Sequence, residues 1–164
     1  MGYAISSLDS FPYLCCMKKS ELAAVCLALL QQKMQEAETA MKAAQESANS
    51  NEKSSMGDKY ETGRAMGQLD RDMHAKRLAA LQVDYRNVLK IDTQVKSDQI
   101  ELGALVQTDT FWYWIAVALG PVLHQQNKVM VLSQQSPIAQ VLVGKRPGDS
   151  FEFNGKKNVI LEVY

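Results

Sequence analysis

Gly57-Asp58-Lys59-Tyr60-Glu61 is the polar turn around which the sequence is organised. A helical pattern of about thirty residues precedes it, and another of similar length follows it before the pattern becomes β-rich. Two long helices joined by a short polar turn predict an antiparallel hairpin. The turn carries two carboxylates three residues apart, Asp58 and Glu61. We expect the hairpin to hold this tip away from the rest of the chain.

The first helix should begin near Ser20, and no Gly or Pro interrupts residues 18–56. Its apolar residues repeat in alternating steps of three and four, which indicates a heptad seam. The seam changes from Leu to Ala toward the tip, so the helices should come close there while burying less apolar surface. The seam residues are Leu27, Leu30, Met34, Ala37, Met41, Ala44 and Ala48.

The second helix is expected from Asp58 to about Ile91, which places the hairpin within residues 18–91. The step of five in its apolar row predicts a local disturbance of the supercoil near residues 74–76. Gly63 and Gly67 each cost about 1 kcal/mol relative to Ala in a helix, so the tip should be the mobile end. The expected seam residues are Met66, Leu69, Met73, Leu78, Leu81, Tyr85 and Val88.

After a linker over residues 92–101, residues 102–164 read as a small β-rich domain. Gly120-Pro121 should end its second strand, and Ser136-Pro137 should begin a short helix that Gly144 ends. Asn154-Gly155 predicts a tight hairpin. The fold class is therefore α+β, an antiparallel coiled-coil hairpin followed by this domain. Strands are expected at 105–107, 111–119, 128–132, 150–153 and 158–164.

Composition excludes several functional classes. Among 164 residues, 18 are basic and 18 acidic, which argues against sequence-specific nucleic-acid binding through a broad basic face. No apolar run approaches the roughly 20 residues of a membrane span. The three cysteines, Cys15, Cys16 and Cys26, form neither a disulfide framework nor a zinc pattern, which favours reduced thiols in a cytoplasmic protein.

Residues 1–17 are expected to be an N-terminal extension. Leu14-Cys15-Cys16 could suggest a lipoprotein cleavage site. A secretory leader would require a basic residue before the site, and no Lys or Arg precedes it. Met17, followed by two lysines and a helix start, is our expected functional start.

The run from Ser136 to Lys145 (Ser-Pro-Ile-Ala-Gln-Val-Leu-Val-Gly-Lys), followed by Gly148-Asp149, resembles the C-terminal domain of the GreA/GreB transcript-cleavage factors. Leu119-Gly120-Pro121 is similar to a Val-Gly-Pro turn of that family. The order of hairpin and domain also matches, so the resemblance covers nearly all of residues 17–164. It implies an FKBP-like fold for residues 102–164.

The resemblance extends to the tip, where Gly57, Asp58 and Glu61 match the family's Gly, Asp and second acidic residue. It implies that the hairpin enters the secondary channel of bacterial RNA polymerase. Asp58 and Glu61 would there help to hold a Mg²⁺ shared with the polymerase, which then hydrolyses backtracked RNA. Oxygen ligands suit Mg²⁺, and a second metal stabilises the attacking and leaving oxygens.

A different interpretation of the two acids stays open. Asp at an N-cap with Glu three residues later is a capping box, which would serve only to start a helix. The tip also departs from the family at residues 62–65, and Lys53, Lys59 and Arg64 balance its acids. A channel-binding regulator that does not stimulate cleavage, or that inhibits, is therefore an alternative.

The resemblance implies a monomer that is not itself an enzyme, because the chemistry would belong to the polymerase. Its expected contacts with the channel rim are Ser136, Pro137, Lys145, Trp112 and Trp114. Strand alternation should send Phe111 and Tyr113 to one face and the two tryptophans to the other. Two further alternatives remain, a peptidyl-prolyl isomerase with an aromatic pocket and a coiled-coil interaction module with no polymerase role.

Overall fold

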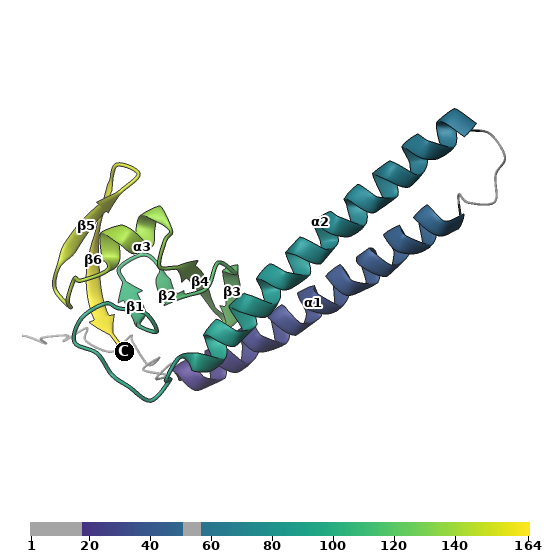
Figure 1. Cartoon of the computed structure of the whole chain (residues 1–164). Helices are drawn as coiled ribbons and strands as arrows, with labels where there is room; N and C mark the ends of the chain where they lie inside the picture. Colours follow the sequence, from purple (N-terminus) through teal and green to yellow (C-terminus); the bar gives the residue numbers. More distant parts are fainter. Residues whose placement is uncertain (1–17, 51–56) are drawn as a thin grey trace, which may run out of the picture.

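The computed structural model describes residues 18–50 and 57–164, except for the side chains of residues 50 and 57–60. The predictions for residues 1–17, with Cys15 and Cys16, and for the loop at 51–56 lie outside this range. Two long helices, α1 (Lys19–Ser50) and α2 (Gly57–Lys90), run antiparallel and lead into a six-stranded sheet with one short helix (Figure 1). The fold is α+β, as predicted. Each long helix spans roughly 50 Å at 1.5 Å per residue.

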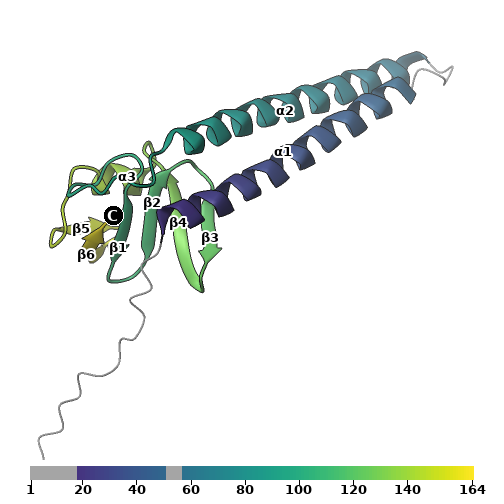
Figure 2. The same ribbon diagram turned by 90° about the horizontal axis from the view of Figure 1, so that it is seen from below.

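The sheet has the order β3-β4-β2-β1-β6-β5. Strands β2 and β4 are parallel, and every other neighbouring pair is antiparallel (Figure 2). The first and last strands of the sheet module, β1 and β6, are therefore neighbours and both lie inside the sheet. The strands are β1 (Leu105–Thr108), β2 (Trp112–Ala116), β3 (Gly120–His124), β4 (Asn127–Ser133), β5 (Ser150–Phe153) and β6 (Lys156–Val163).

Strand β3 is not expected from the sequence, because Gly120-Pro121 is typical of the end of a strand. Gly120 has a φ of 84°, a conformation that glycine adopts without strain, and the chain reverses there. Pro121 is tolerated because β3 is an edge strand, where a missing N–H breaks no ladder on the open side. The turn from β3 to β4 uses Gln125 and Gln126 at positive φ, and these residues are weak signals for such a turn.

Two local predictions are confirmed. Helix α3 (Pro137–Leu142) begins at Ser136, whose side chain accepts a hydrogen bond of 3.3 Å from the backbone N–H of Ala139. Gly144 follows the helix with a φ of 86°. Asn154 and Gly155 join β5 to β6, and both have positive φ. Turn chemistry that is visible in the sequence therefore sets both ends of α3 and the last hairpin.

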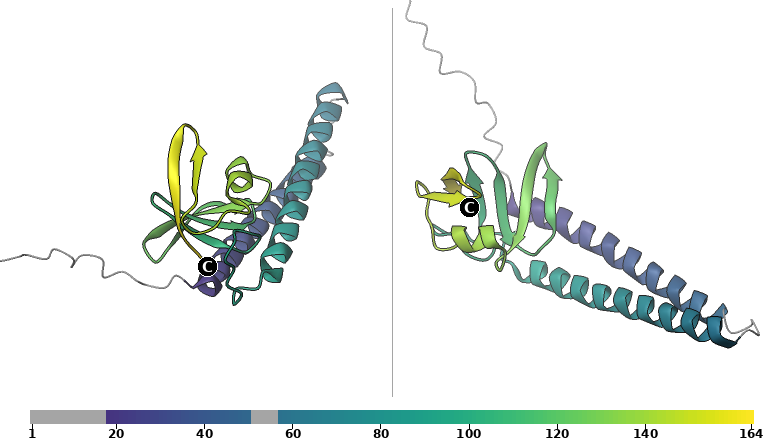
Figure 3. Two further views of the ribbon diagram at one scale, coloured as in Figure 1. Left: turned by 90° about the vertical axis from the view of Figure 1, so that its left-hand side faces the viewer. Right: turned by 90° about the horizontal axis from the view of Figure 1, so that it is seen from above.

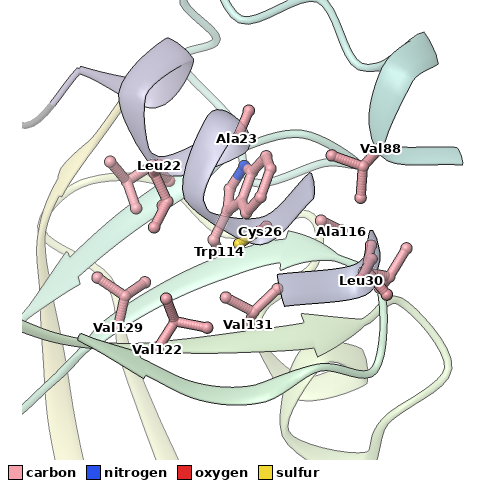
Figure 4. Packing of buried hydrophobic residues seen from close by; sticks show 12 residues of the cluster. Leu22, Ala23, Cys26, Leu30, Val88, Trp114, Ala116, Val122, Val129 and Val131 are labelled. Carbon is pink, nitrogen blue, oxygen red and sulfur yellow. The ribbon is translucent and has the colours of Figure 1, made fainter. Parts of the chain in front are cut away.

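The sheet separates two hydrophobic cores. On one face, the base of the hairpin packs against β1 to β4 (Figure 4). On the other face, α3 packs against β1, β2 and the β5–β6 hairpin. The first core takes four buried residues from α1 but only Val88 from α2. Helix α1 thus holds the sheet, and the distal hairpin projects beyond it (Figure 3).

The predicted seam is correct for α1, because all seven of its residues are buried or half-buried. It is wrong for the distal half of α2, where Met66, Leu69 and Met73 are exposed. The half-buried residues there are Gly63, Gly67, Arg71, His74 and Ala75, and all of these except Ala75 continue the row of Leu78, Leu81, Tyr85 and Val88. This row keeps steps of three and four from Gly67 onward, so the predicted phase slip is wrong as well.

Candidate partner-binding surfaces

The hairpin tip holds the two acids singled out in the sequence. Helix α2 begins at Gly57, so the backbone places Asp58 in its first turn and Glu61 in its second. The side chain of Glu61 is exposed, whereas that of Asp58 lies outside the described residues. A capping box requires its first residue at the N-cap, just before the helix. Asp58 lies inside the helix, so this backbone does not have the arrangement of a capping box.

Just behind the tip, the helices approach each other through small side chains. A Cβ added to Gly67 would lie 2.8 Å from the Cβ of Ala48, so only glycine fits this crossing. One turn further along α2, Arg71 donates a hydrogen bond of 3.0 Å to Oε1 of Gln45 on α1, and its guanidinium contacts Asp72 at 2.8 Å. Close packing and a polar bridge therefore join the distal helices.

The hairpin base is tied to the sheet by polar contacts as well as by the core. Gln125 donates a hydrogen bond of 2.7 Å to Oε2 of Glu21, whose carboxylate lies 3.7 Å from Nε2 of the buried His124. Lys19 donates to the carbonyl of Val95, and burial lowers the pKa of its ammonium group. These contacts set the direction in which the hairpin leaves the sheet.

An apolar groove opens on the α3 face of the sheet, with a volume of about 480 Å³. Phe111 forms one edge and meets Tyr113 edge-on, with ring centroids 6.3 Å apart. Burial, with the charge of Asp109, raises the pKa of the Tyr113 phenol, so its hydroxyl stays neutral. The other apolar lining residues are Met130, Leu132, Ile138 and Phe153.

The rim of the groove is polar and basic. Lys128 and Lys156 are exposed there together with Thr110 and Asn154, Asn158 is buried, and the described lining contains no carboxylate. An apolar floor with a basic rim suits an amphipathic segment that carries acidic residues. Sequence reasoning placed Phe111 and Tyr113 on one face of the strand but did not select them as binding residues.

The five predicted rim contacts do not form one surface. Trp114 is fully buried beneath α1, where its Nε1 donates to the carbonyl of Gly103 at 3.2 Å. Trp112 is half-buried and stacks on Tyr164. The two tryptophans share one face of the strand, as alternation predicted, and this face is the one that packs on the hairpin. Trp114 therefore offers no surface to a partner, and the prediction for this residue is corrected.

The remaining three predicted contacts lie at the two ends of α3. Pro137 is exposed at the start of the helix, beside the groove residue Ile138. Ser136 uses its hydroxyl to cap the helix. Lys145 follows the far end, where its carbonyl accepts from the N–H of Ile100. Ser136 and Lys145 thus position α3, and Pro137 is exposed next to a residue that lines the groove.

The described residues contain neither a metal-binding cluster nor a membrane-spanning helix. Within residues 18–50 and 57–164, no group of three or more His, Cys, Asp or Glu side chains is arranged to hold a metal ion. Neither long helix, nor any other described helix, has an apolar stretch sufficient to cross a membrane.

No protein-family model matches this chain, and no curated protein matches it. Among solved structures, that of the transcription factor Gfh1 matches with 18% identity over 90% of this chain and 94% of that chain. The TM-score of this match is 0.33, which is low, so our proposals rest on the residues and geometry of the chain itself.

Proposed function

We propose that this chain binds bacterial RNA polymerase and regulates transcript elongation in the manner of Gre factors. The hairpin would enter the secondary channel, and the sheet module would stay at the channel rim. One observation carries the proposal. The Ser136–Lys145 run, which resembles the Gre family in sequence, forms a capped helix beside an apolar groove, in a chain whose other half is a hairpin roughly 50 Å long.

The groove is the surface that we assign to the rim. Its apolar lining includes Phe111 and Ile138, and Lys128 and Lys156 line it as well. A helix of the polymerase rim with apolar and acidic side chains would match both features. The hairpin base, fixed to the opposite face of the same sheet, would then point the tip in one direction.

At the tip, Asp58 and Glu61 would assist the polymerase active centre. Two carboxylates do not complete a magnesium site, and no third ligating side chain accompanies Glu61 among the described residues. A Mg²⁺ would therefore be held jointly with carboxylates of the polymerase, where it would stabilise charge on the reacting oxygens. On this account the chain is not an enzyme by itself, has no cofactor of its own, and acts in the cytoplasm.

A non-cleaving or inhibitory regulator is the second candidate, and the charge of the tip favours it. Arg64 is exposed one turn after Glu61, and Lys59 lies between the two acids in sequence. Basic groups next to the carboxylates would compete with a metal ion for them. Such a protein would occupy the channel without supplying metal ligands.

Stimulated cleavage in a backtracked elongation complex separates these candidates, with Asp58→Asn as the variant. Asn keeps the size and polarity of Asp at this position, but it lacks the charge for a metal. Activation by the wild-type chain that Asp58→Asn abolishes, with the melting temperature unchanged, supports metal assistance. Polymerase binding without activation by the wild type supports the second candidate. Absence of polymerase binding at low salt contradicts both and leaves a coiled-coil interaction module.

A further inference from the structure

Helix α2 carries a second row of residues with seam-like spacing, here named the outer row. It follows alternating steps of three and four on nearly the opposite side of α2 from the seam. Met66, Leu69 and Met73 are 55%, 63% and 57% exposed, and Val83 is 46% exposed. The outer row consists of Met66, Leu69, Met73, Lys76, Ala80 and Val83.

The spacing of the outer row indicates the shape of its partner. Large apolar side chains at these steps form the a and d positions of a two-helix seam. Such a row is covered by another helix with matching spacing. Helix α2 meets the sheet core through Leu81, Tyr85 and Val88, which belong to the seam row and not to the outer row. The large apolar side chains of the outer row therefore remain exposed.

Charges beside the row specify which helix fits. Asp70 and Arg77 flank the row on the same side, two turns apart, at equivalent heptad positions. In the described part of the chain, neither side chain has an oppositely charged group within 4.0 Å, and all ion pairs found there involve other residues. In an antiparallel pair of helices, flanking positions of this type face each other. A second α2 therefore brings Arg77 to Asp70 and Asp70 to Arg77.

We infer that the outer row binds the outer row of a second copy of this chain in an antiparallel arrangement. One register satisfies both the apolar and the charged residues. It sets Met66 against Val83 of the other copy, Leu69 against Ala80, and Met73 against the aliphatic stem of Lys76. In the same register, two symmetric Asp70–Arg77 pairs lie beside the seam. Its centre falls near the middle of α2, so the two helices overlap along most of their length.

A parallel pair of the same helices is less favourable. It places the two Lys76 ammonium groups opposite each other within the apolar seam, where like charges repel. It also leaves Asp70 next to Ala65 without a basic partner. Arg77 would there face Asp72, but that carboxylate already contacts Arg71 of its own helix. The repulsion between the Lys76 groups and the unpaired Asp70 therefore favour the antiparallel orientation.

The self-associated form would differ from the monomer in thickness, because two hairpins would lie side by side along the arm. If the proposed function is correct, this form would not enter an opening that admits a single hairpin, and self-association would withhold the chain from polymerase. The pairing itself does not depend on that function, so its test needs no polymerase.

The first test is sedimentation velocity of the full chain over a concentration series that extends to its solubility limit. We expect a reversible monomer–dimer equilibrium. Met73→Lys should weaken it about tenfold or more, since a large apolar side chain is no longer buried. Gln68→Lys adds the same charge at an exposed site of α2 away from the row and should leave it unchanged. A wild-type chain that stays monomeric, or equal effects of the two variants, would overturn the inference.

The second test fixes the register through charge exchange. Asp70→Arg and Arg77→Asp should each weaken self-association, because each sets like charges against one another. Mixing the two variants should restore association, because both flanking positions of one copy then carry arginine and both of the other carry aspartate. A mixture that fails to associate would rule out the antiparallel register. Far-ultraviolet circular dichroism checks that all variants keep the wild-type helical content.

Discussion

Gly67 faces Ala48 across the hairpin at a distance that leaves no room for a side chain, since a Cβ on Gly67 would lie 2.8 Å from that of Ala48. The atom opposite is attached directly to the backbone, so it cannot rotate away. Glycine normally weakens a helix by about 1 kcal/mol relative to alanine. Here it allows the close crossing that brings Arg71 within hydrogen-bonding distance of Gln45.

Gly67→Ala should therefore loosen the distal hairpin despite its better helix propensity. We expect a net loss of about 1 kcal/mol, because overpacking of about 1–3 kcal/mol exceeds the propensity gain. Hydrogen exchange of the amides around residues 45–48 and 67–71 measures this local effect. Adding Ala48→Gly reopens the space, so the double variant should recover the protection of the wild type. Equal or greater protection in Gly67→Ala alone would show that the crossing is not tight.

Trp114 and Trp112 should differ in their contribution to stability, although they are two residues apart on β2. Trp114→Ala removes a fully buried ring and should lower the free energy of unfolding by about 3–5 kcal/mol. Trp112→Ala removes a half-buried ring stacked on Tyr164 and should cost clearly less. Urea denaturation measures both values. Similar losses for the two variants would contradict the assignment of Trp114 to the core under α1.

The thiol of Cys26 should be unreactive in the native chain. It is buried in the core between α1 and the sheet, and burial raises its pKa from 9.0 to about 12. In a variant with Cys15 and Cys16 replaced by Ser, alkylation at about pH 8 should be slow until denaturant is added. Rapid alkylation of the native chain would mean that the hairpin base opens readily.

The same shift predicts how stability depends on pH. The folded pKa of Cys26 lies above the unfolded value, so the contribution of the neutral thiol is complete below pH 9.0. It is lost as the pH rises from 9.0 toward 12, because the unfolded state then releases its proton more readily. Cys26→Ala should remove this part of the decline. The control is the melting temperature near neutral pH. There the Cys26 thiol is neutral in both the folded and the unfolded state, so it contributes nothing to the dependence of stability on pH.

Loss of the α3 cap should affect the groove. Ser136→Ala removes the hydrogen bond to the N–H of Ala139 and should cost about 1 kcal/mol. Ser136→Asn retains an acceptor and is the matched control. If the groove binds the polymerase rim, affinity should fall for Ser136→Ala and stay near wild type for Ser136→Asn. A drop in affinity that is equal for both would assign a direct contact to the serine hydroxyl.

Much of the architecture could be predicted because strong local signals coincide with tertiary structure. The seven α1 seam residues, the cap at Ser136 and the Asn154-Gly155 turn are examples. Each depends on spacing or on a backbone conformation that few residues adopt. The unpredicted strand β3 shows the opposite case. Gly120 and Pro121 normally end a strand, and only the position of β3 at the sheet edge makes them compatible with pairing.

The distal seam of α2 could not be predicted because the helix has two rows with the same period. Periodicity detects apolar rows but does not tell which row meets the partner helix. Met66, Leu69 and Met73 are the more apolar row, yet the close approach at Ala48 requires the row that contains Gly67. The prediction of the candidate site from the sequence has a similar limit. Alternation separated Tyr113 from Trp114, but only the packing of α1 decides which face of the strand remains open.

The most direct test of the central claim is the position of the tip in a complex with polymerase. A photo-crosslinking amino acid at Glu61, which is exposed, should label the largest polymerase subunits close to the active centre in a backtracked elongation complex. The same probe at Phe111 should label the channel rim. At Glu152, which is exposed on β5, the probe serves as the control position. Labelling from Glu61 that is absent, or that falls only on the outer surface of polymerase, would contradict the account.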